Sequence, residues 1–515
     1  MVAFVGSDAI NVTATGAAIG GYADQFNMNF QVRIGDFDVS LRIAGLSPSD
    51  VWAKAGLMAR ETLDPGARFA SALATPAMNG SFFEWRDPAG SLAGTAGIFP
   101  ANYPNMWVRL KRTGNTFTGY ASYDGQNWSQ LGSATISMPS QIYFGPVVTS
   151  GTTSQATLAQ FRDISNVTDA SSAVVVNPHE PAGPSSRKTP IVISEIMYKP
   201  APRTDTNNLE FVELYNSNPW FHDISGYRLV GSSLDYTFPA GSILQGGAFL
   251  VIAASPASIQ SVYGITNVVG PYTGSLKKAD TVQLFDEAGA LLLTVPYANV
   301  WPWPVATDGT GHSLVLARPT YGEEDPRAWD ISDIVGGSPG QMEAFRPSPL
   351  RNVVINEYLA HTDPPDYDYV ELYNHSTQPV DLSGCILTDN PNTNKFVIPA
   401  GTTIPAGGFV FYSETNMNFA LNAAGEAIYF KNPDGSRYLD AVSFGGQENG
   451  VATGRWPDGG DEFYRLSAKT PGAPNGSIRQ SDIVINELMY DPISGNDDDQ
   501  YIELYNRSSQ AVDLG

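Results

Sequence analysis

Glutamates arranged in pairs recur three times in this sequence and are its clearest candidates for acid–base chemistry. The first member of each pair ends an apolar run and the second lies in an aromatic hexapeptide: Glu195 with Glu213, Glu357 with Glu371, and Glu487 with Glu503. Two neighbouring carboxylates can divide the roles of general acid and general base. The alternative is structural, because a glutamate repeated at one place can accept hydrogen bonds from backbone N–H groups or tyrosine. We favour the structural interpretation.

Acidic loops separate the two glutamates of each pair. Their carboxylates are Asp205 and Glu210 in the first copy, Asp363, Asp366 and Asp368 in the second, and Asp497, Asp498 and Asp499 in the third. Clusters of hard oxygen ligands can hold Ca²⁺, which takes six to eight oxygens. The candidate Ca²⁺ ligands are Asp363, Asp366 and Asp368, and no other cofactor is indicated. Because no ligand spacing recurs between the loops, a solvated acidic loop is the favoured alternative.

The remaining catalytic patterns are weak. Residues 336–340 fit G-x-S-x-G around Ser338, but that site uses the backbone N–H of the next residue, and Pro339 has none. The corresponding Thr470-Pro471-Gly472 of the second copy indicates a turn that ends a domain. The histidines show no zinc-binding spacing, and surface or turn positions are predicted for them: His179, His222, His312, His361 and His375. No catalytic residue is predicted, and we expect no enzymatic activity in this chain.

The elements that position these residues are repeated units. Each copy combines an apolar run ending in glutamate, a hexapeptide close to Tyr-Val-Glu-Leu-Tyr-Asn and an aspartate-centred step such as Asp381-Leu382-Ser383-Gly384. Glu213 and Glu371 are 158 residues apart, and Glu371 and Glu503 are 132 apart. Solenoid repeats are much shorter than this. The copies are therefore tandem domains.

Composition limits the fold and the partners. The 50 Gly and 37 Pro residues punctuate short β-branched and aromatic runs with no helical periodicity, which predicts all-β sandwiches. A formal net charge of −23 opposes binding to nucleic acid or anionic lipid. No run of eighteen apolar residues predicts a membrane-spanning segment. The single cysteine, Cys385, excludes an internal disulfide and is predicted to be a buried strand residue.

The segment before about residue 166 also reads as a β-sandwich. Alternation places Val108 and Leu110 on one face of a strand and Trp107 and Arg109 on the other. An Asp-Gly pair within residues 123–128, flanked by aromatics, predicts a hairpin turn.

This segment offers a candidate glycan site. Aromatic faces stack on sugar rings, and Asp or Asn side chains hydrogen-bond to hydroxyl groups. The candidate ligand-binding residues are Tyr103, Trp107, Asp124, Asn127 and Trp128. The alternative is that the tryptophans belong to the core, since large aromatics are usually mostly buried.

Residues 23–26, 35–39, 52–61, 107–112 and 122–128 together resemble the bacterial concanavalin A-like (laminin-G-like) sandwich modules of extracellular proteins. That resemblance implies a jelly-roll fold and a mostly non-catalytic module that often accompanies carbohydrate binding. Glucanase relatives of the fold carry paired carboxylates in an E-x-D-x-x-E strand. Up to Val167 this chain has only Glu61 and Glu84, and neither has such a neighbour.

From Ile191 onward, the order of V-x-I-x-E, V-E-L-Y-N, D-L-S-G and a later Trp-Pro resembles the lamin tail domain, an immunoglobulin-like β-sandwich. In bacteria such domains occur in secreted and surface proteins as tethering or interaction modules. The nuclear filament role requires a coiled-coil rod, and no heptads occur here.

The predicted organisation is a concanavalin A-like domain, a Pro/Ser-rich linker, two lamin tail domains and the start of a third, at residues 1–167, 168–190, 191–345, 346–478 and 479–515. The start lacks the pattern of a signal peptide and the third copy contains only its first strands, so we expect a piece of a longer chain. The predicted function is a non-catalytic, multidomain binding or adhesion protein, extracellular or at the cell surface. Its expected partners are polysaccharide or cell-surface glycan and other extracellular protein domains. The alternative is the non-catalytic part of a larger secreted enzyme.

Overall fold

The computed structural model describes residues 2–6, 8–76, 79–167, 179–343, 346–480 and 482–514. Regular structure in these ranges is almost all β-strand, as the sequence predicts, beside two short α-helices, α1 (Pro256–Tyr263) and α2 (Glu414–Met417). Neither of these two helices is long and apolar enough to cross a membrane. Short 3-10 helices lie in the loops: η2 (Val305–Thr307), η3 (Pro319–Tyr321), η4 (Pro326–Ala328), η5 (Pro349–Asn352) and η6 (Asp497–Asp499).

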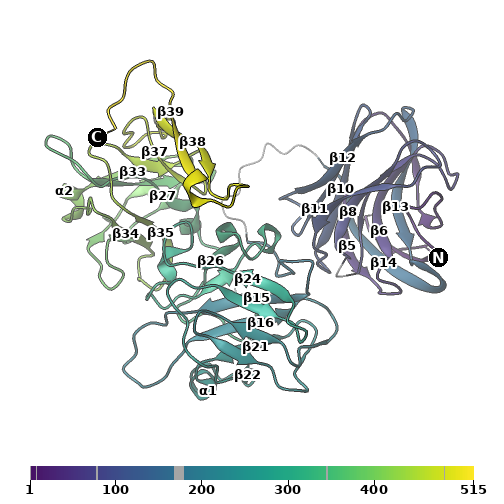
Figure 1. Cartoon of the computed structure of the whole chain (residues 1–515), viewed down its shortest axis with the longest axis horizontal. Coiled ribbons are helices and arrows are strands. Elements are labelled where there is room, and N and C mark those ends of the chain that lie inside the picture. Colours follow the sequence, from purple (N-terminus) through teal and green to yellow (C-terminus); the bar gives the residue numbers. More distant parts are fainter. Residues whose placement is uncertain are drawn as a thin grey trace. The chain divides into compact units, whose positions relative to one another are not determined.

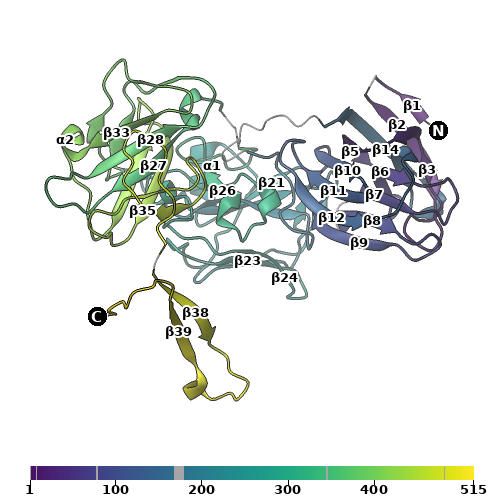
Figure 2. The same ribbon diagram turned by 90° about the horizontal axis from the view of Figure 1, so that it is seen from above.

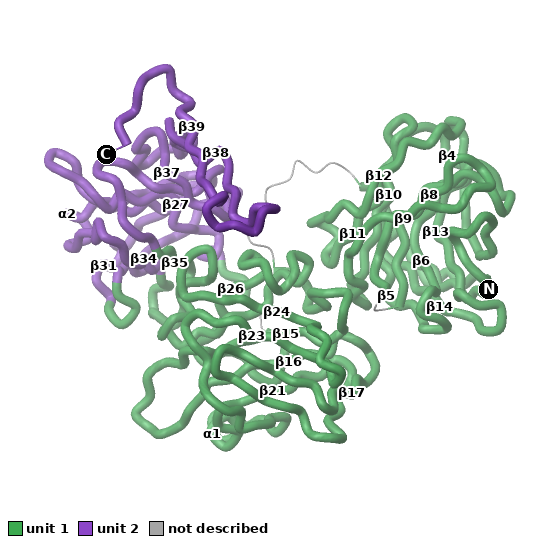
Figure 3. The backbone as a smooth tube through the Cα atoms, viewed as in Figure 1, with its two compact units in different colours: residues 1–348, 390–393, 431–443 green, residues 349–389, 394–430, 444–515 purple. Residues whose placement is uncertain are grey.

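The chain divides into two compact units, which Figure 3 shows in two colours. One comprises residues 1–348, 390–393 and 431–443, and the other comprises residues 349–389, 394–430 and 444–515.

The first domain is a sandwich of two antiparallel seven-stranded sheets (Figure 1). One sheet has the order β1 (Val2–Phe4), β2 (Ile10–Gly16), β14 (Thr152–Asn166), β5 (Phe37–Leu46), β10 (Met106–Thr113), β11 (Thr116–Ser122), β12 (Ser129–Thr135). The other has the order β3 (Asn27–Met28), β13 (Gln141–Thr149), β6 (Lys54–Arg60), β7 (Phe69–Ala74), β8 (Ser81–Arg86), β9 (Gly94–Phe99), with β4 (Gln31–Ile34) also paired to β13.

Alternation along the strands builds the core of this sandwich, as predicted for β10. Val108 and Leu110 are fully buried between the sheets, while Trp107 and Arg109 on the opposite face are half-buried. The second sheet also buries charges on its outer face. Asp24 forms ion pairs of 2.6 Å with both Arg60 and Arg86.

Glu84 is part of that buried charge on the second sheet. It forms an ion pair of 3.1 Å with Lys54, and both residues are buried. Buried charges persist when they are paired and hydrogen-bonded. Glu84 is therefore held by a neighbouring cation rather than by a second carboxylate.

The first repeat packs two sheets around a shared core. The larger sheet has the order β22 (Val268–Val269), β21 (Phe249–Ala253), β16 (Phe211–Asn216), β15 (Ile191–Met197), β25 (Leu314–Leu316), β26 (Trp329–Ile331). The smaller has the order β19 (Asp235–Thr237), β18 (Arg228–Val230), β23 (Val282–Phe285), β24 (Leu291–Val295), and β17 (His222–Asp223) pairs with β20 (Ile243–Leu244).

The second repeat has the same plan. Its larger sheet has the order β33 (Phe409–Ser413), β28 (Tyr369–Asn374), β27 (Val353–Leu359), β36 (Thr453–Arg455), β37 (Phe463–Arg465). The smaller has the order β31 (Phe396–Val397), β30 (Ile386–Thr388), β34 (Glu426–Lys431), β35 (Tyr438–Phe444), and β29 (Val380–Asp381) pairs with β32 (Thr403–Ile404). The third copy is a hairpin of β38 (Ile483–Met489) and β39 (Tyr501–Asn506).

The hairpin that starts each copy has one register in all three, and it places the paired glutamates. Glu195 lies opposite Glu213, Glu357 opposite Glu371, and Glu487 opposite Glu503. Each first strand has a β-bulge one residue before its glutamate. A bulge re-aims side chains, and here it turns the bulged residue toward the opposite glutamate.

The aspartate-centred steps are turns, which explains their composition. Asp381 accepts a hydrogen bond of 2.9 Å from the backbone N–H of Ser383, and Gly384 has a φ of +78°. Asp223 and Ser225 make the same contact at 2.9 Å in the first repeat. Aspartate favours such turns and glycine alone adopts positive φ without strain.

Candidate functional site

The outer face of strand β10 presents the aromatic residues predicted for a glycan site. The guanidinium carbon of Arg109 lies 5.0 Å from the ring centre of Tyr120 and 5.6 Å from that of Trp128. The guanidinium carbon of Arg42 lies 6.0 Å from the ring centre of Trp107. Both tryptophans are half-buried, and they lie on the solvent side of the sheet instead of in the core between the sheets.

The loop beside these tryptophans is ordered by Asp124. One carboxylate oxygen accepts hydrogen bonds of 2.8 Å from the backbone N–H groups of Gln126 and Asn127, and the other accepts one of 2.7 Å from the Asn127 amide. Gly125 has a φ of +72° and lies so close to Trp107 that a Cβ there would approach the ring to 2.9 Å. Asp124 therefore fixes the loop, and Asn127 is the exposed polar residue beside Trp128.

Tyr103 has a different role from the other predicted ligand-binding residues. Its ring packs against the core, and its hydroxyl donates a hydrogen bond of 2.9 Å to the carbonyl oxygen of Thr75. Burial raises the pKa of this hydroxyl. Tyr103 is half-buried like the two tryptophans, but its ring and hydroxyl contact the interior. The candidates on the outer face are therefore the half-buried Trp107 and Trp128 and the exposed Asn127.

The acidic loop of the second repeat gives each candidate Ca²⁺ ligand a different protein partner. Asp363 accepts a hydrogen bond of 2.5 Å from the Asn449 amide, and Asp366 forms an ion pair with Lys469. Asp368 is buried and accepts a hydrogen bond of 3.0 Å from the backbone N–H of Leu421. Among the residues that the structure describes, no three His, Cys, Asp or Glu side chains are gathered where they could hold a metal ion.

The paired glutamates of the first repeat bind the turn that ends the same repeat. Glu195 accepts a hydrogen bond of 3.1 Å from the backbone N–H of Ser338. Glu213 accepts one of 2.5 Å from the backbone N–H of Gly340 and one of 2.7 Å from the hydroxyl of Ser194. These hydrogen bonds join residues that are 143 and 127 positions apart in the chain.

The second repeat makes the same contacts with different residues. Glu357 accepts hydrogen bonds from the backbone N–H of Thr470 at 3.0 Å and from its hydroxyl at 2.6 Å. Glu371 accepts hydrogen bonds from the backbone N–H of Gly472 at 2.6 Å and from the amide of Asn356 at 3.1 Å. The structural interpretation of the glutamates is confirmed in both complete repeats, since their carboxylates accept backbone hydrogen bonds.

Burial sets the electrostatics of these carboxylates. It raises the pKa of Glu213 and that of Glu371 to about 8, because the charged form loses its hydration. The pKa of Glu195 is also raised, mainly by burial and to a smaller extent by the charge of Glu213. Such groups are poised to hold a proton near neutral pH.

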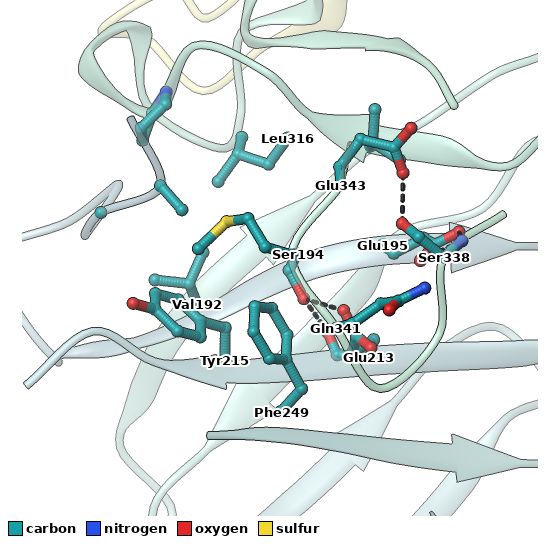
Figure 4. Close-up of a pocket in the computed structure, with 15 residues that line it drawn as sticks. Val192, Ser194, Glu195, Glu213, Tyr215, Phe249, Leu316, Ser338, Gln341 and Glu343 are labelled. Carbon is teal, nitrogen blue, oxygen red and sulfur yellow. Dashed lines mark hydrogen bonds between the residues drawn. The ribbon is translucent and has the colours of Figure 1, made fainter. Parts of the chain in front are cut away.

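A hollow opens beside the glutamates of the first repeat (Figure 4). Its empty volume, open solvent included, is about 420 Å³. On one side the rings of Tyr215 and Phe249 stack with their centres 4.6 Å apart. On the other, the hydroxyl of Ser338 donates a hydrogen bond to Glu343. The nearby carboxylate oxygens already accept protein hydrogen bonds, so the hollow offers a ligand apolar contact more than free polar groups.

Ser338 lies in a turn, as predicted. Ser338 is followed by Pro339, which has no N–H to donate, and the hydroxyl of Ser338 donates a hydrogen bond to the carboxylate of Glu343. The G-x-S-x-G sequence is therefore the final turn of a domain in which two glutamates hold the backbone.

The predictions for histidine and cysteine have different outcomes. His312 is 1% exposed and its Nδ1 lies 2.8 Å from the carbonyl oxygen of Ser332, so the prediction of a surface or turn position is wrong for this residue. Burial lowers the pKa of His312 to about 4. Cys385 is fully buried, as predicted, but it lies directly before strand β30 instead of within a strand. Burial raises the pKa of its thiol to about 12.

Sequence reasoning missed the residue at the bulge. In the second repeat the amide nitrogen of Asn356 donates to Asp458 at 3.0 Å, and its amide oxygen accepts from the backbone N–H of Gly459 at 3.0 Å. The sequence did offer a signal for this role. A polar residue stands directly before the first glutamate in every copy: Ser194 in the first, Asn356 in the second and Asn486 in the third.

Comparison with known families agrees with the repeated architecture. Residues 184–299 and 346–446 match the family model of the Lamin Tail Domain. Each matched region contains one pair of glutamates, and the final turns at residues 338–340 and 470–472 lie outside them. No curated protein matches the chain.

Several solved structures resemble part of the chain in fold. A functionally unknown protein from Saccharomyces cerevisiae is 14% identical with a TM-score of 0.28, covering 33% of this chain and 92% of its own. The carbohydrate binding module CBM66 from Bacillus subtilis is 16% identical with a TM-score of 0.24, and the match covers 32% of this chain and 100% of the module. A β-glucanase from Bacillus licheniformis is 10% identical with a TM-score of 0.23, and the match covers 32% of this chain and 82% of the glucanase chain.

Proposed function

Starting from a chain that contains two lamin tail domains behind a two-sheet β-sandwich, we propose that it is a non-catalytic, multidomain binding protein. It acts outside the cell or at the cell surface. The first sandwich binds a polysaccharide or a cell-surface glycan, and the lamin tail domains serve as tethers or spacers that contact other extracellular protein domains.

The observation that carries this proposal is the position of Trp128. Its ring lies on the solvent side of the first sheet above the guanidinium of Arg109, next to the exposed amide of Asn127. A cation beneath one ring face leaves an aromatic surface for a sugar ring, and the amide supplies hydrogen bonds. Because Asp124 holds the loop in one conformation, little conformational freedom is lost when a ligand binds.

The non-catalytic part of the proposal rests on how the candidate acids are used. Glu84 is paired with Lys54, and the repeated glutamates hold backbone N–H groups. Groups committed to protein partners in this way are poorly placed to act on a substrate.

The test compares glycan binding by the intact chain and by Trp128→Ala. The full chain is applied to an array of plant, fungal and bacterial polysaccharides, and we expect at least one to be bound, with at least tenfold weaker binding by Trp128→Ala. Trp52→Ala is the matched control, because Trp52 is 53% exposed in the same sandwich and is not one of the proposed ligand-binding residues. Absence of binding by the intact chain, or equal binding by a well-folded Trp128→Ala variant, would contradict the proposal.

A further inference from the structure

Trp107 is built into the outer face of the first sheet in the same way as Trp128. The guanidinium carbon of Arg42 lies 6.0 Å from the centre of the Trp107 ring. Arg42 in turn donates hydrogen bonds of 2.6 Å from Nε to Asp163 and of 3.1 Å from Nη1 to the carbonyl oxygen of Pro104. The arginine is therefore fixed by protein acceptors, and it supports the ring.

The support under Trp128 has the same composition. Its arginine, Arg109, donates hydrogen bonds of 2.7 and 2.5 Å to the two carboxylate oxygens of Asp38. Such a bidentate contact fixes the plane of the guanidinium group, and a cation over a ring face is itself attracted to the ring. Each tryptophan thus lies on an arginine that an aspartate holds, which gives two supported aromatic groups on one face.

The aspartate under Trp107 has an unusual backbone conformation. Asp163 has a φ of +55° within β14, where the register between β14 and β5 shifts. Residues other than glycine seldom adopt a positive φ, and those that do are concentrated at functional sites. The sheet therefore tolerates a local strain at the residue whose carboxylate holds Arg42.

The register of strand β10 sets the order of the two aromatic groups. Trp107 lies opposite Arg42 of β5. Arg109 lies opposite Tyr120 of β11, in the layer formed by β5, β10, β11 and β12 (Figure 2). Residues two apart on one face of a strand are about 7 Å apart. Trp107 and the ring of Trp128 over Arg109 therefore follow each other along the strand, as linked units of one glycan chain do.

One loop fixes the two rings relative to each other. Gly125 packs on Trp107 so closely that a Cβ there would come within 2.9 Å of the ring, and Trp128 follows in the same loop. The carboxylate of Asp124 accepts hydrogen bonds of 2.8 Å from the backbone N–H groups of the two residues between Gly125 and Trp128. A site whose parts are already in place loses less conformational freedom when a ligand binds.

The groups beside the rings suit an uncharged ligand. Asn127 and Gln130 are exposed, and Gln130 lies opposite Tyr120 on β12, the last strand of the sheet. A side-chain amide both donates and accepts hydrogen bonds, as a sugar hydroxyl group does. The arginines under the rings are paired with aspartates and are not available to a sugar carboxylate or sulfate. This chemistry favours a neutral sugar.

Resting on the proposed binding of glycans by the first sandwich, we propose that Trp107 and Trp128 are two successive platforms for a linear, neutral polysaccharide. One sugar ring stacks on Trp128, where Asn127 and Gln130 bind its hydroxyl groups, and another ring of the same chain stacks on Trp107. A sheet face does not enclose the end of a chain as a closed pocket does. The polysaccharide therefore continues past both rings, and the site binds internal sugar units.

Oligosaccharides of increasing length test the proposal on the full chain. The probes are linear cello-, xylo-, manno- and laminari-oligosaccharides, from the disaccharide to the hexasaccharide, and oligomers of any other neutral polysaccharide that is bound on the array. Isothermal titration calorimetry measures their affinities. We expect the affinity for at least one series to rise about tenfold or more from the disaccharide to the hexasaccharide, because the longer chain contacts both rings at once.

Modified chain ends provide a test that needs no variant of the protein. The hexasaccharide of the bound series is compared with its alditol, in which the sugar at the reducing end is opened, and with a hexasaccharide that carries an O-methyl group at the non-reducing end. We expect all three to bind with equal affinity, because the proposed contacts are made to internal units.

Variants separate the two platforms. Trp107→Ala is expected to bind the disaccharide as the parent chain does and to lose the gain in affinity with length, whereas Trp107→Phe keeps an aromatic ring and retains part of that gain. Trp128→Ala is expected to weaken binding at every length. Trp52→Ala is again the control, because Trp52 is 53% exposed in the same sandwich and belongs to neither platform. The melting temperature of each variant verifies that it is folded.

Several results would overturn the proposal while glycan binding by the chain stands. Affinity that does not rise beyond the disaccharide shows a single platform. An unchanged gain with length in a folded Trp107→Ala variant shows that this ring takes no part. Loss of affinity when either chain end is modified shows that the site holds an end, and binding confined to anionic or branched glycans excludes the proposed ligand. If no polysaccharide on the array is bound, the proposed function itself fails.

Discussion

Glu213 and Glu371 connect the stability of the lamin tail domains to pH, because burial raises the pKa of each to about 8 in the folded state. In the unfolded chain these groups titrate near the ordinary value of 4.5. The folded state therefore binds more protons between these two values, and the free energy of unfolding falls as the pH rises from about 4.5 to about 8.

Thermal unfolding measured across this pH range checks the expectation. We expect the melting temperature of the second repeat to decline toward pH 8 and the decline to be shallower in Glu371→Gln, whose amide cannot titrate. An identical pH profile for Glu371→Gln and the parent chain would show that this carboxyl does not change its protonation state in the folded protein.

Single residues also show where sequence reasoning succeeds and fails. The structural role of the glutamates was predictable because three copies place them identically in a pattern of strands. Their partners at Ser338 and Thr470 were not, because they lie more than a hundred residues away and no local periodicity joins them. His312 was misplaced for the same reason, since its burial depends on residues brought together by the fold.

At the scale of elements, the approach to the final turn of the first repeat depends on a glycine that the second repeat lacks, since Lys469 stands at the matching position there. Gly337 has a φ of +74°, and a Cβ there would lie 1.9 Å from a carboxylate oxygen of Glu195. Gly241 in the same repeat has a φ of +85° and open space around the position of a Cβ.

We expect Gly337→Ala to be more destabilising than Gly241→Ala by about 1–3 kcal/mol, because both variants strain the backbone and the first also displaces Glu195. Chemical denaturation of the two variants measures the difference. Equal loss of stability would mean that Glu195 moves aside without cost.

Strands were the most predictable elements. The sequence predicts strands at residues 191–196, 210–216, 353–358 and 369–374, and the structure has them at 191–197, 211–216, 353–359 and 369–374. The agreement is this close because apolar alternation and β-branched residues define these strands locally. The β-bulge before each first glutamate was not predicted, since a one-residue insertion leaves no local mark in an otherwise apolar run.

At the scale of the whole molecule, the net charge of −23 acts on every partner. Its field repels polyanions, and this repulsion is screened over about 10 Å at 0.1 M salt. We therefore expect a sulfated or carboxylated polysaccharide to bind more weakly than a neutral one of the same backbone, and we expect this difference in affinity to shrink as the salt concentration rises. Affinity electrophoresis of the chain in gels that contain either polysaccharide, at about 20 and about 300 mM NaCl, measures the difference. Tighter binding of the anionic form at low salt would contradict this expectation.

In both lamin tail domains, the glutamates of the first hairpin hold the last turn, so the point where the chain enters the fold is fastened to the point where it leaves. When such a protein is stretched between two anchored partners, tension enters through these same two points. The carboxylate–backbone hydrogen bonds are then among the first to carry the load, and the interior strands are shielded until they break. A domain built in this way resists pulling at the contact between its first hairpin and its last turn, and its mechanical strength depends on the protonation of a few buried acids.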